Sequence, residues 1–290
     1  MFRLVNLNGR AALQGSRGVF DLARLSGDES LADPMVAISR HRELHSLSDS
    51  AASREPDGPL EPGALGAPVP SPRQVFGIGL NYRDHAEETG APTPPAPLTF
   101  TKFPSCIVGP RSDVALSGDT VDWEVELVVV IGDTCRRVEA NDAWTKVAGL
   151  TLGQDVSDRT VQRTGTPPQF NLGKSFSTYG PIGPALVSVD SFVDPDDVQL
   201  SCEISGEQMQ HSSSAQLIFS VPTLVSYLSS VCELSPGDLI FTGTPSGVGA
   251  VRGRFLRPGD VIVSRAEVIG EMHNRCVAGE APFGVEPSAR

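Results

Sequence analysis

The sequence predicts a mainly β protein of the α+β class, with few and short helices. Runs of apolar and β-branched residues, each closed by glycine, proline or a polar turn, recur at 74–80, 97–103, 121–132 and within 236–249. The 29 glycines and 24 prolines fit a chain with many turns and loops. Helical spacing of apolar residues is clearest after Ser220, which can cap a helix that has Pro222 in its first turn.

Length and charge limit what the protein can be. Its 290 residues suffice for one large domain and a small one. A net charge of −12 argues against nucleic acid and against an anionic membrane as partners. The N-terminus lacks the apolar core of a signal peptide, and no apolar run approaches the roughly 20 residues that span a membrane. Five cysteines without a CxxC pair indicate neither a zinc site nor a disulfide framework, so we expect a reduced, cytoplasmic protein.

Composition divides the chain into four segments. Residues 1–53 are expected to form a small N-terminal domain of short strands and a loosely helical stretch. Residues 54–73 are rich in proline and glycine and are expected to form a linker. We expect a catalytic domain at 74–278 and a flexible tail at 279–290.

Two carboxylates are built into the most apolar predicted strand, 121–132. Glu124 and Glu126 are two residues apart, so in a strand they project to one face while their apolar neighbours face the other. Like charges beside a hydrophobic strand repel each other and are poorly solvated. A hard cation such as Mg²⁺, Mn²⁺ or Ca²⁺ would resolve this conflict, because such ions prefer oxygen ligands. The alternative is a strand end at the surface with both side chains solvated.

A short helix that ends at Gly90 is predicted to carry a histidine and a carboxylate on one face. His85 and Glu88 are three residues apart and therefore neighbours on that helix. A carboxylate orients an imidazole and raises its basicity, which suits a general base. The proline-rich stretch 92–97 suits a mobile loop, so the helix could act as a lid. The alternative is an exposed pair that contributes roughly a few tenths of a kcal/mol.

Later segments offer further polar groups. Asp155 follows a predicted strand and is a candidate third oxygen ligand. Arg159 and Gln162 share one face if their segment is helical, where they could grip a carboxylate. Lys174 is a candidate for a buried ammonium that faces the substrate. The preceding sequence does not make it part of a phosphate-binding loop, because Pro168 stands where that loop requires glycine.

The glycine-rich loop within 236–249 is a candidate anion site. It can present backbone N–H groups and the Thr244 hydroxyl to an anion. Its glycine spacing differs from that of a dinucleotide-binding fingerprint. We therefore expect it to contact a small anionic substrate.

Taken together and in this order, these segments resemble the fumarylacetoacetate hydrolase superfamily. The resemblance covers residues 74–277. The motifs that carry it are GLNYRDH at 79–85, DWEVEL at 122–127 with VIG at 130–132, QDVSDR at 154–159, GKSF at 173–176 and TGTPSGVG at 242–249. Five ordered matches are far more specific than any one of them.

The resemblance implies a fold, a metal site and residue roles. The implied fold is a mixed β-roll of several small sheets with few helices, assembled as a homodimer. A divalent cation, Mg²⁺ or alternatively Mn²⁺ or Ca²⁺, would be held by Glu124, Glu126 and Asp155. The implied catalytic residues are His85 and Glu88, on a lid that orders when substrate binds, and Lys174. The implied substrate-binding residues are Arg159, Gln162, Gly243 and Thr244.

Two residues depart from the family pattern. The family often has an acidic residue directly after the arginine, where this chain has Thr160. It often has tryptophan shortly before the Gly-Lys-Ser segment, where this chain has Phe170. Both lie near the expected pocket and therefore bear on the substrate rather than on the metal site.

The resemblance and the residues together suggest hydrolysis of a carbon–carbon bond in a β-diketo acid of the acylpyruvate or fumarylpyruvate type. The cation would chelate the keto acid, and His85 would take a proton from water. The hydroxide would attack the distal carbonyl and leave a pyruvate-like enolate, which the cation and Lys174 stabilise. The chain lacks a GxSxG elbow, which disfavours a serine hydrolase.

Other reactions fit the same residues. Decarboxylation of oxaloacetate and isomerisation of 2-hydroxyhepta-2,4-diene-1,7-dioate also pass through an enolate held at the cation. A non-catalytic protein that binds metal and a keto acid is the alternative of another class. The dyad and the lysine argue against it, because a binding protein has no use for a general base.

Overall fold

Strand β10 (Val125–Ile131) is the centre of the largest sheet, between β11 (Val147–Gln154) and β16 (Leu239–Phe241). The chain is described by a computed structural model over residues 1–90 and 92–282. Every residue of β10 is buried. Val128 and Val130 pack in one core cluster, while the alternate residues of β10 from Val125 to Ile131 pack in another. A strand that is covered on both faces needs apolar side chains on both, which explains the unbroken apolar run from Leu127 to Ile131.

The largest sheet has eleven strands and mixed directions. Its path runs β3 (Gly18–Asp21), β2 (Arg10–Gly15), β1 (Arg3–Leu7), β13 (Gly180–Val187), β11, β10, β16, β5 (Val75–Gly79) and β6 (Leu98–Thr101). Off this path, β4 (Leu65–Gly66) pairs with β1 and β7 (Ile107–Val108) pairs with β13. The β16–β5 and β13–β7 pairs are parallel, whereas the other pairs are antiparallel.

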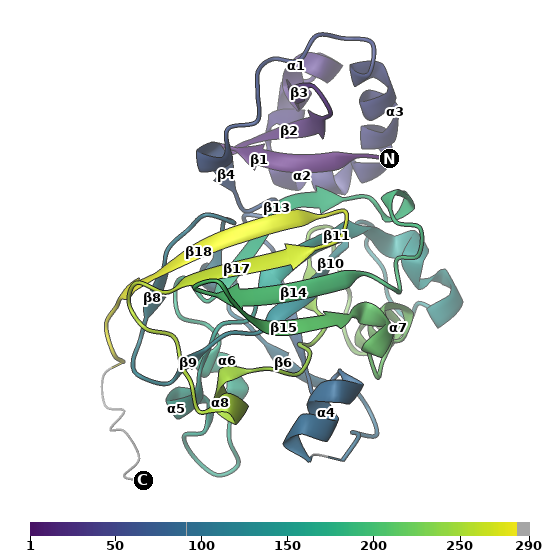
Figure 1. Cartoon of the computed structure of the whole chain (residues 1–290). Helices are drawn as coiled ribbons and strands as arrows, with labels where there is room; N and C mark the ends of the chain where they lie inside the picture. Colours follow the sequence, from purple (N-terminus) through teal and green to yellow (C-terminus); the bar gives the residue numbers. More distant parts are fainter. Residues whose placement is uncertain (91, 283–290) are drawn as a thin grey trace.

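A five-stranded sheet covers one face of β10 and β11 (Figure 1). Its order is β15 (Glu207–Ser213), β14 (Gln199–Ile204), β17 (Val261–Ala266), β18 (Gly270–Ala278) and β8 (Val114–Leu116). Inward-facing residues such as Leu200 and Ile204 share a core cluster with Leu127 of β10. A third, two-stranded sheet pairs β12 (Ser157–Asp158) with β9 (Val121–Asp122). Mixed sheets dominate and helices are few and short, which confirms the predicted fold class.

The N-terminal segment extends the same large sheet. Strand β1 pairs with β13 of the main domain. Three helices, α1 (Leu22–Ser26), α2 (Pro34–Ser39) and α3 (His41–Ala51), lie beside these strands (Figure 1). Their apolar residues join Val128 and Val130 in one core cluster. The predicted linker 54–73 contributes β4 to the sheet. The division at 53 and 73 stays a prediction, but the segments on either side share a sheet and a core.

Four short helices gather at the end of the molecule away from the N-terminal segment (Figure 1). They are α4 (Arg83–Thr89), α5 (Arg159–Gln162), α6 (Phe170–Gly173) and α8 (Gly249–Arg252). The longer α7 (Val221–Val231) begins after Ser220, as predicted, and buries Leu224, Val225 and Leu228. The short 3₁₀ helices are η1 (Glu29–Ala32), η2 (Pro62–Ala64), η3 (Pro104–Cys106), η4 (Ala140–Lys146), η5 (Val189–Ser191) and η6 (Ser214–Gln216).

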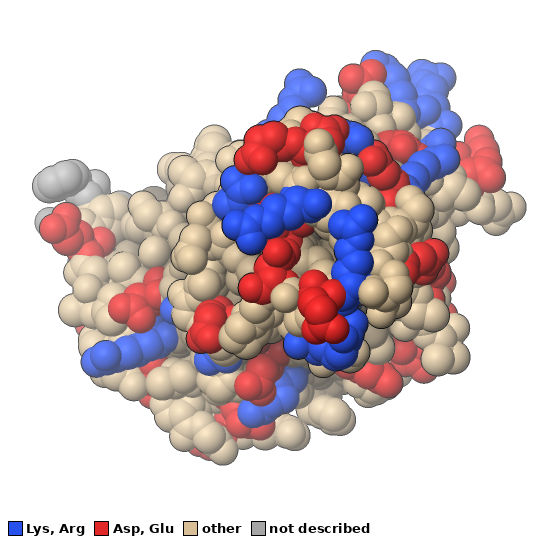
Figure 2. All heavy atoms as spheres, turned by 90° about the horizontal axis from the view of Figure 1, so that it is seen from above, with Lys and Arg blue, Asp and Glu red and all other residues tan. Residues whose placement is uncertain are grey.

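The face that carries the N-terminal segment mixes both signs of charge (Figure 2). Many of its charged groups are paired, as in Arg10–Asp21 and Arg40–Glu43. Interspersed charges of opposite sign produce little net field over a surface. Within 1–90 and 92–282, no helix is long and apolar enough to cross a membrane. Residues 283–290 of the predicted tail lie outside the described residues.

Candidate active site and metal centre

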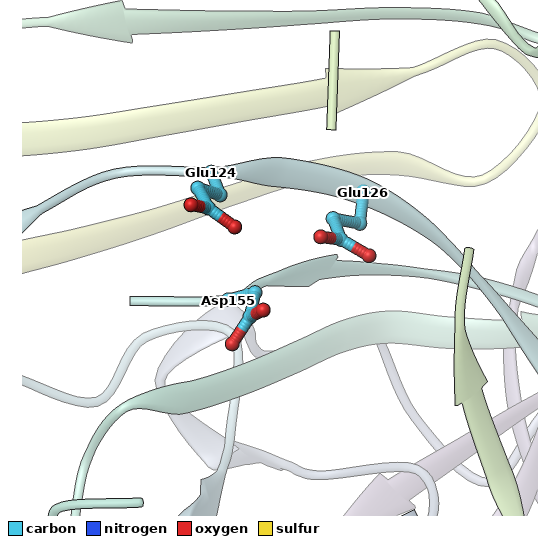
Figure 3. Close-up of side chains that lie close together, drawn as sticks. All are labelled: Glu124, Glu126 and Asp155. Atoms are coloured by element: carbon cyan, nitrogen blue, oxygen red, sulfur yellow. The ribbon is translucent and has the colours of Figure 1, made fainter. Parts of the chain in front are cut away.

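Three buried carboxylates meet where two central strands adjoin. Glu126 belongs to β10, Glu124 immediately precedes that strand, and Asp155 immediately follows β11. The Asp155 N–H donates to the carbonyl oxygen of Glu124 at 2.9 Å, which keeps the two backbones side by side. One ligand atom from each side chain lies within 4.8 Å of the others, and the three carboxylates face a common space (Figure 3). The strand expected at 121–132 is interrupted at Trp123 and Glu124, yet the two glutamates share a face as predicted.

Lys174 binds two of these carboxylates. Its Nζ donates to Glu124 Oε2 and Asp155 Oδ2, each at 2.7 Å, and to Ser157 Oγ at 2.8 Å. The side chain is almost fully buried, as predicted from the sequence. Lys174 directly follows α6, which ends at Gly173. This glycine lies so close to α5 that a Cβ on it would come within 2.7 Å of the backbone nitrogen of Gln162. The close approach of α6 to α5 therefore brings the ammonium to the carboxylates.

Lys102 also contacts the cluster, and the sequence did not single it out. Its buried Nζ donates to Asp155 Oδ1 at 2.7 Å and to the carbonyl oxygen of Lys174. The chain has three lysines, and two of them lie here. A lysine in the otherwise uncharged segment 97–103 was the available signal, because a lysine in a buried strand needs a partner for its charge.

Charge balance in the cluster leaves one carboxylate without a cation. Burial, Asp155 and Glu124 all raise the pKa of Glu126 well above its usual range. Burial would also raise the pKa of Glu124, but Lys174 and Arg159 lower it to about 2. Burial opposes the charge on Lys174, but Asp155 and Glu124 outweigh it and raise the pKa of this lysine. Three converging oxygen donors with an uncompensated carboxylate fit a hard divalent cation.

The predicted His85–Glu88 pair is brought together on α4. His85 Nδ1 lies 3.2 Å from Glu88 Oε2. Glu88 is itself held by the Gly247 N–H, at 3.0 and 3.1 Å from its two carboxylate oxygens. When Nδ1 carries the proton and donates to Glu88, Nε2 is left as the proton acceptor. Gly90, with φ of 64°, ends the helix as expected, while the lid role of α4 stays a prediction.

Two adjoining cavities surround these groups. The inner cavity, of about 200 Å³, is lined by Glu124, Glu126 and Lys174. The outer cavity, of about 370 Å³, lies beside α5 and α8. Four residues line both cavities: His85, Arg159, Gln162 and Phe170. His85 thus stands at the junction, next to the carboxylate cluster and to the outer space.

Arg159 and Gln162 lie on one turn of α5, as the sequence suggested. Arg159 Nη1 donates to Gln162 Oε1 at 2.9 Å. Its Nη2 lies 2.7 Å from oxygens of both Asp122 and Glu124, and its Nε donates to Asp122 at 2.9 Å. The protein's own acceptors therefore engage every nitrogen of this guanidinium. Its predicted grip on a substrate carboxylate stays a prediction.

Gly243 and Thr244 lie in the glycine-rich loop after β16. The Gly243 N–H donates to Glu126 Oε2 at 2.7 Å, so the anion it contacts belongs to the protein. Its φ is +107°, and a Cβ would lie 2.8 Å from that of Asn81, so a side chain does not fit. Thr244 Oγ1 donates to the Val125 carbonyl at 2.9 Å and lines the inner cavity.

The two departures from the family pattern differ in their position. Thr160 Oγ1 pairs with Thr120 Oγ1 at 2.8 Å and lines neither cavity. Phe170 lines both cavities and packs edge-to-face on Phe100 with ring centroids 5.8 Å apart. Phe170 is therefore the departure that shapes the pocket.

Residues 74–277 match the family described as fumarylacetoacetate (FAA) hydrolase C-terminal. The chain belongs to this family, and it is an enzyme of the fumarylacetoacetate hydrolase superfamily. The match confirms the resemblance that the five sequence motifs indicated.

The chain is also similar in sequence or structure to individual members of this family. The chain is 40% identical over 266 residues to oxaloacetate tautomerase FAHD2A, mitochondrial, from Bos taurus, covering 90% of this chain and 84% of that protein. An HpcE-type protein from Mycobacterium smegmatis superposes with a TM-score of 0.87 at 46% identity, over 96% of this chain and 100% of that one. Maleylpyruvate hydrolase from Sphingobium sp. SYK-6, solved with manganese(II) and pyruvate, gives a TM-score of 0.78 at 26% identity, with the same coverage.

Proposed function

We propose that this enzyme interconverts the keto and enol forms of a 2-oxo acid of the oxaloacetate type. The observation that carries the proposal is the content of the inner cavity. Two carboxylates, a buried ammonium and an imidazole line one space of about 200 Å³, and the third carboxylate, that of Asp155, lies beside the other two. These are the groups that removal of a proton next to a carbonyl requires, namely a base and stabilisers for the developing oxyanion.

Each residue has a task in this reaction. Glu124, Glu126 and Asp155 would hold Mg²⁺ or Mn²⁺, which supplies Lewis-acid polarisation of the substrate oxygens. Lys174 donates to Glu124, Asp155 and Ser157 in the metal-free protein, and once a cation shares these carboxylates it would turn one N–H to the 2-oxygen as negative charge develops there. Neutral His85 accepts the C3 proton at Nε2, and Glu88 stabilises the imidazolium that forms. Transfer of this proton to the 2-oxygen gives the enol and restores neutral His85.

The relatives support this choice of substrate. The bovine protein, 40% identical over 90% of this chain, is named as an oxaloacetate tautomerase. Manganese(II) and pyruvate in the maleylpyruvate hydrolase structure support a divalent cation and a 2-oxo acid in this kind of site. We take Mg²⁺ and Mn²⁺ as the candidate ions, since both prefer oxygen ligands.

Carbon–carbon hydrolysis of an acylpyruvate is the second candidate. The His85–Glu88 contact of 3.2 Å favours it, because an oriented imidazole can deprotonate water as readily as carbon. The 26% identical maleylpyruvate hydrolase has the same fold over 96% of this chain. In this reaction His85 would take its proton from water, and Lys174 would stabilise the departing enolate. Decarboxylation, isomerisation and binding without turnover are the remaining outcomes of the test.

The test separates these reactions by their products. Purified protein with Mg²⁺ or Mn²⁺ would be given oxaloacetate, and keto–enol equilibration followed by ultraviolet absorbance. Pyruvate release would be measured in parallel from oxaloacetate and from acylpyruvates. Faster equilibration without pyruvate release is the expected result. Cleavage of acylpyruvates without faster equilibration would replace the proposal by hydrolysis.

Variants test the residue assignments in the same assays. Glu124→Gln is expected to remove the metal-dependent rate, and His85→Gln to lower it by about 10²–10⁴-fold. His273→Gln is the matched control, because His273 lies on β18 and lines neither cavity. Full metal-dependent activity in Glu124→Gln would show that the ligand assignment is wrong.

Two partners are part of the proposal. The small anionic keto acid is one, and a second copy of the chain, forming a homodimer, is the other. Light scattering coupled to size-exclusion chromatography would test the dimer, and a monomeric mass would exclude it.

A further inference from the structure

A buried glutamine joins the glycine-rich loop to the strand that carries the carboxylates. Gln210 lies on β15 of the five-stranded sheet and is 1% exposed. Its Oε1 accepts the N–H of Val125 at 3.0 Å, and its Nε2 donates to Thr244 Oγ1 at 2.8 Å and to the Pro245 carbonyl at 2.9 Å. The side chain lines neither the inner nor the outer cavity. Gln210 therefore acts on the site through the groups that it holds.

The partners of Gln210 fix which end of its amide is the oxygen. A backbone N–H only donates and a carbonyl oxygen only accepts, so the amide end beside the Val125 N–H is Oε1 and the end beside the Pro245 carbonyl is Nε2. A flipped amide would set donor against donor at Val125 and acceptor against acceptor at Pro245. With the amide fixed in this way, Nε2 is the donor to Thr244 and the threonine oxygen is the acceptor.

The hydroxyl proton of Thr244 is engaged as well. Thr244 Oγ1 donates at 2.9 Å to the Val125 carbonyl, which only accepts. A hydroxyl has one proton and two lone pairs. The protein therefore uses the proton and one lone pair of Thr244, and one lone pair remains for a ligand in the inner cavity, which this residue lines. Thr244 Oγ1 thus accepts from a ligand and does not donate to it, so a carboxylate or keto oxygen is a poor partner for this hydroxyl.

A 2-oxo acid offers a hydroxyl donor in one of its two forms. At neutral pH the keto form carries no O–H group, because its carboxyl groups are ionised, whereas the enol form carries one at the 2-oxygen. Other acceptors that line the inner cavity have tasks of their own in the proposed reaction. Glu124 and Glu126 are the proposed metal ligands, and His85 is the proposed base. Thr244 is a neutral acceptor outside these groups.

We propose that Thr244 Oγ1 accepts a hydrogen bond from the 2-hydroxyl of the enol form, and that Gln210 is the positioning residue that fixes this polarity. The inference rests on the proposed function and adds to it a means of distinguishing the two tautomers. The enol meets an oriented acceptor, whereas a keto oxygen at the same place meets a lone pair. A neutral hydrogen bond of this kind contributes about three- to tenfold in affinity.

The test compares two three-carbon acids that differ at the 2-position. Lactate carries a hydroxyl there and pyruvate a keto oxygen. Each acid, with both enantiomers of lactate, is titrated into the Mg²⁺-loaded protein and followed by nuclear magnetic resonance. The ratio of the lactate affinity to the pyruvate affinity is then compared between variants, so that intrinsic differences between the acids cancel.

Variants of Thr244 test the acceptor. Thr244→Val has nearly the same shape without the hydroxyl and should lower the ratio about three- to tenfold. Thr244→Ser keeps the hydroxyl and should keep the ratio. Thr244→Ala, in which a water can both donate and accept, should also lower the ratio, and it replaces the valine variant if that variant does not fold.

Gln210→Met tests the positioning role. Methionine fills much of the same volume but has no amide, so the Thr244 hydroxyl is free to turn its proton to a keto oxygen and the ratio should fall. Gln154→Met is the matched control. Gln154 is equally buried and its Oε1 accepts the N–H of Glu124 at 3.0 Å, but among the residues described none of its hydrogen bonds involves Thr244. Both variants should lose stability in urea unfolding, whereas only Gln210→Met should change the ratio.

Unchanged ratios in Thr244→Val and Thr244→Ala would overturn the assignment of Thr244 as the acceptor. A wild-type ratio in Gln210→Met, or an equal fall in Gln154→Met, would overturn the positioning role of Gln210. The ratio requires no turnover, so its expected changes would support the acceptor for a 2-hydroxyl even if oxaloacetate is not enolised. Failure of this inference is therefore distinct from failure of the proposed function.

Discussion

Replacing Lys174 with methionine should tighten metal binding while it removes turnover. The Lys174 ammonium lies 2.7 Å from both Glu124 and Asp155, two of the three proposed metal ligands. It therefore competes with a divalent cation for the same carboxylates. Methionine preserves much of the buried aliphatic volume and carries no charge, so Lys174→Met removes the competitor without a large change in packing.

The size of the effect follows from the charges involved. Two unit charges about 4 Å apart interact by about 4 kcal/mol at an effective dielectric constant of about 20. Repulsion between the ammonium and a divalent cation is at least of this order, but the lysine can relax towards Ser157, to which it donates at 2.8 Å. If about 1.4–2 kcal/mol survives this relaxation, the affinity for the metal rises about 10- to 30-fold.

Removal of the ammonium also weakens the metal-free protein. Breaking a buried ion pair typically costs about 3–5 kcal/mol, because a carboxylate is left uncompensated. Added metal supplies the missing charge. The rise in melting temperature on adding Mg²⁺ should therefore be larger for Lys174→Met than for the wild type.

Isothermal titration calorimetry with Mg²⁺ and Mn²⁺ measures the affinity of each variant for the metal. Thermal unfolding with and without metal measures how much the bound metal stabilises the fold. Lys146→Met is the matched control, because Lys146 lies on η4 and lines neither cavity. Unchanged or weaker metal binding by Lys174→Met, with the variant folded, would refute the competition between lysine and metal.

Three further predictions concern the same cluster. Because burial, Asp155 and Glu124 raise the pKa of Glu126, the metal-free fold holds a proton that the unfolded chain loses, so its stability falls as pH rises above the ordinary glutamate pKa towards the raised one. Metal binding should release this proton, so the affinity for the metal should rise with pH by up to about tenfold per pH unit. Calorimetry in buffers of different ionisation enthalpy measures the number of protons released, and a value of zero would contradict this prediction. Lys102→Met should lower the free energy of unfolding of the metal-free protein by about 3 kcal/mol, measured by urea unfolding. This is the low end for a broken buried ion pair, because Asp155 still pairs with Lys174. A loss no greater than that of Lys146→Met would be evidence against a buried Lys102–Asp155 ion pair. Gly243→Ala should weaken metal binding in calorimetry, because its Cβ displaces the N–H that holds Glu126, whereas wild-type affinity would exclude this positioning role.

Local patterns predicted the central strand and its carboxylates correctly. Alternation of side chains along a strand is a local property, so the shared face of Glu124 and Glu126 could be inferred from their spacing. The helix after Ser220 was predictable for the same reason, since its cap and its apolar spacing lie within one short segment. The interruption at Trp123 was not predicted, because it arises where β9 leaves one sheet and β10 enters another.

Contacts between distant segments could not be predicted in this way. The pairing of Lys102 with Asp155 joins residues 53 positions apart, and that of Gly243 with Glu126 joins residues 117 apart. The N-terminal segment looked separate because a proline- and glycine-rich stretch follows it. Its first strand nevertheless pairs with β13. This pairing could not be predicted, because the backbone N–H and C=O groups at a strand edge are the same whatever the sequence and do not indicate the partner strand.

The sequence by itself determined that the protein is mainly β, that it resembles the fumarylacetoacetate hydrolase superfamily, and that Glu124 and Glu126 face one way beside a candidate third ligand in Asp155. Only the tertiary structure decided which cations meet those carboxylates. It assigned Lys174 and Lys102 to the cluster and engaged Arg159 with the protein's own acids. The physical reason is that a residue's type fixes its charge, whereas the partner of that charge depends on which distant segments the fold brings within hydrogen-bonding distance.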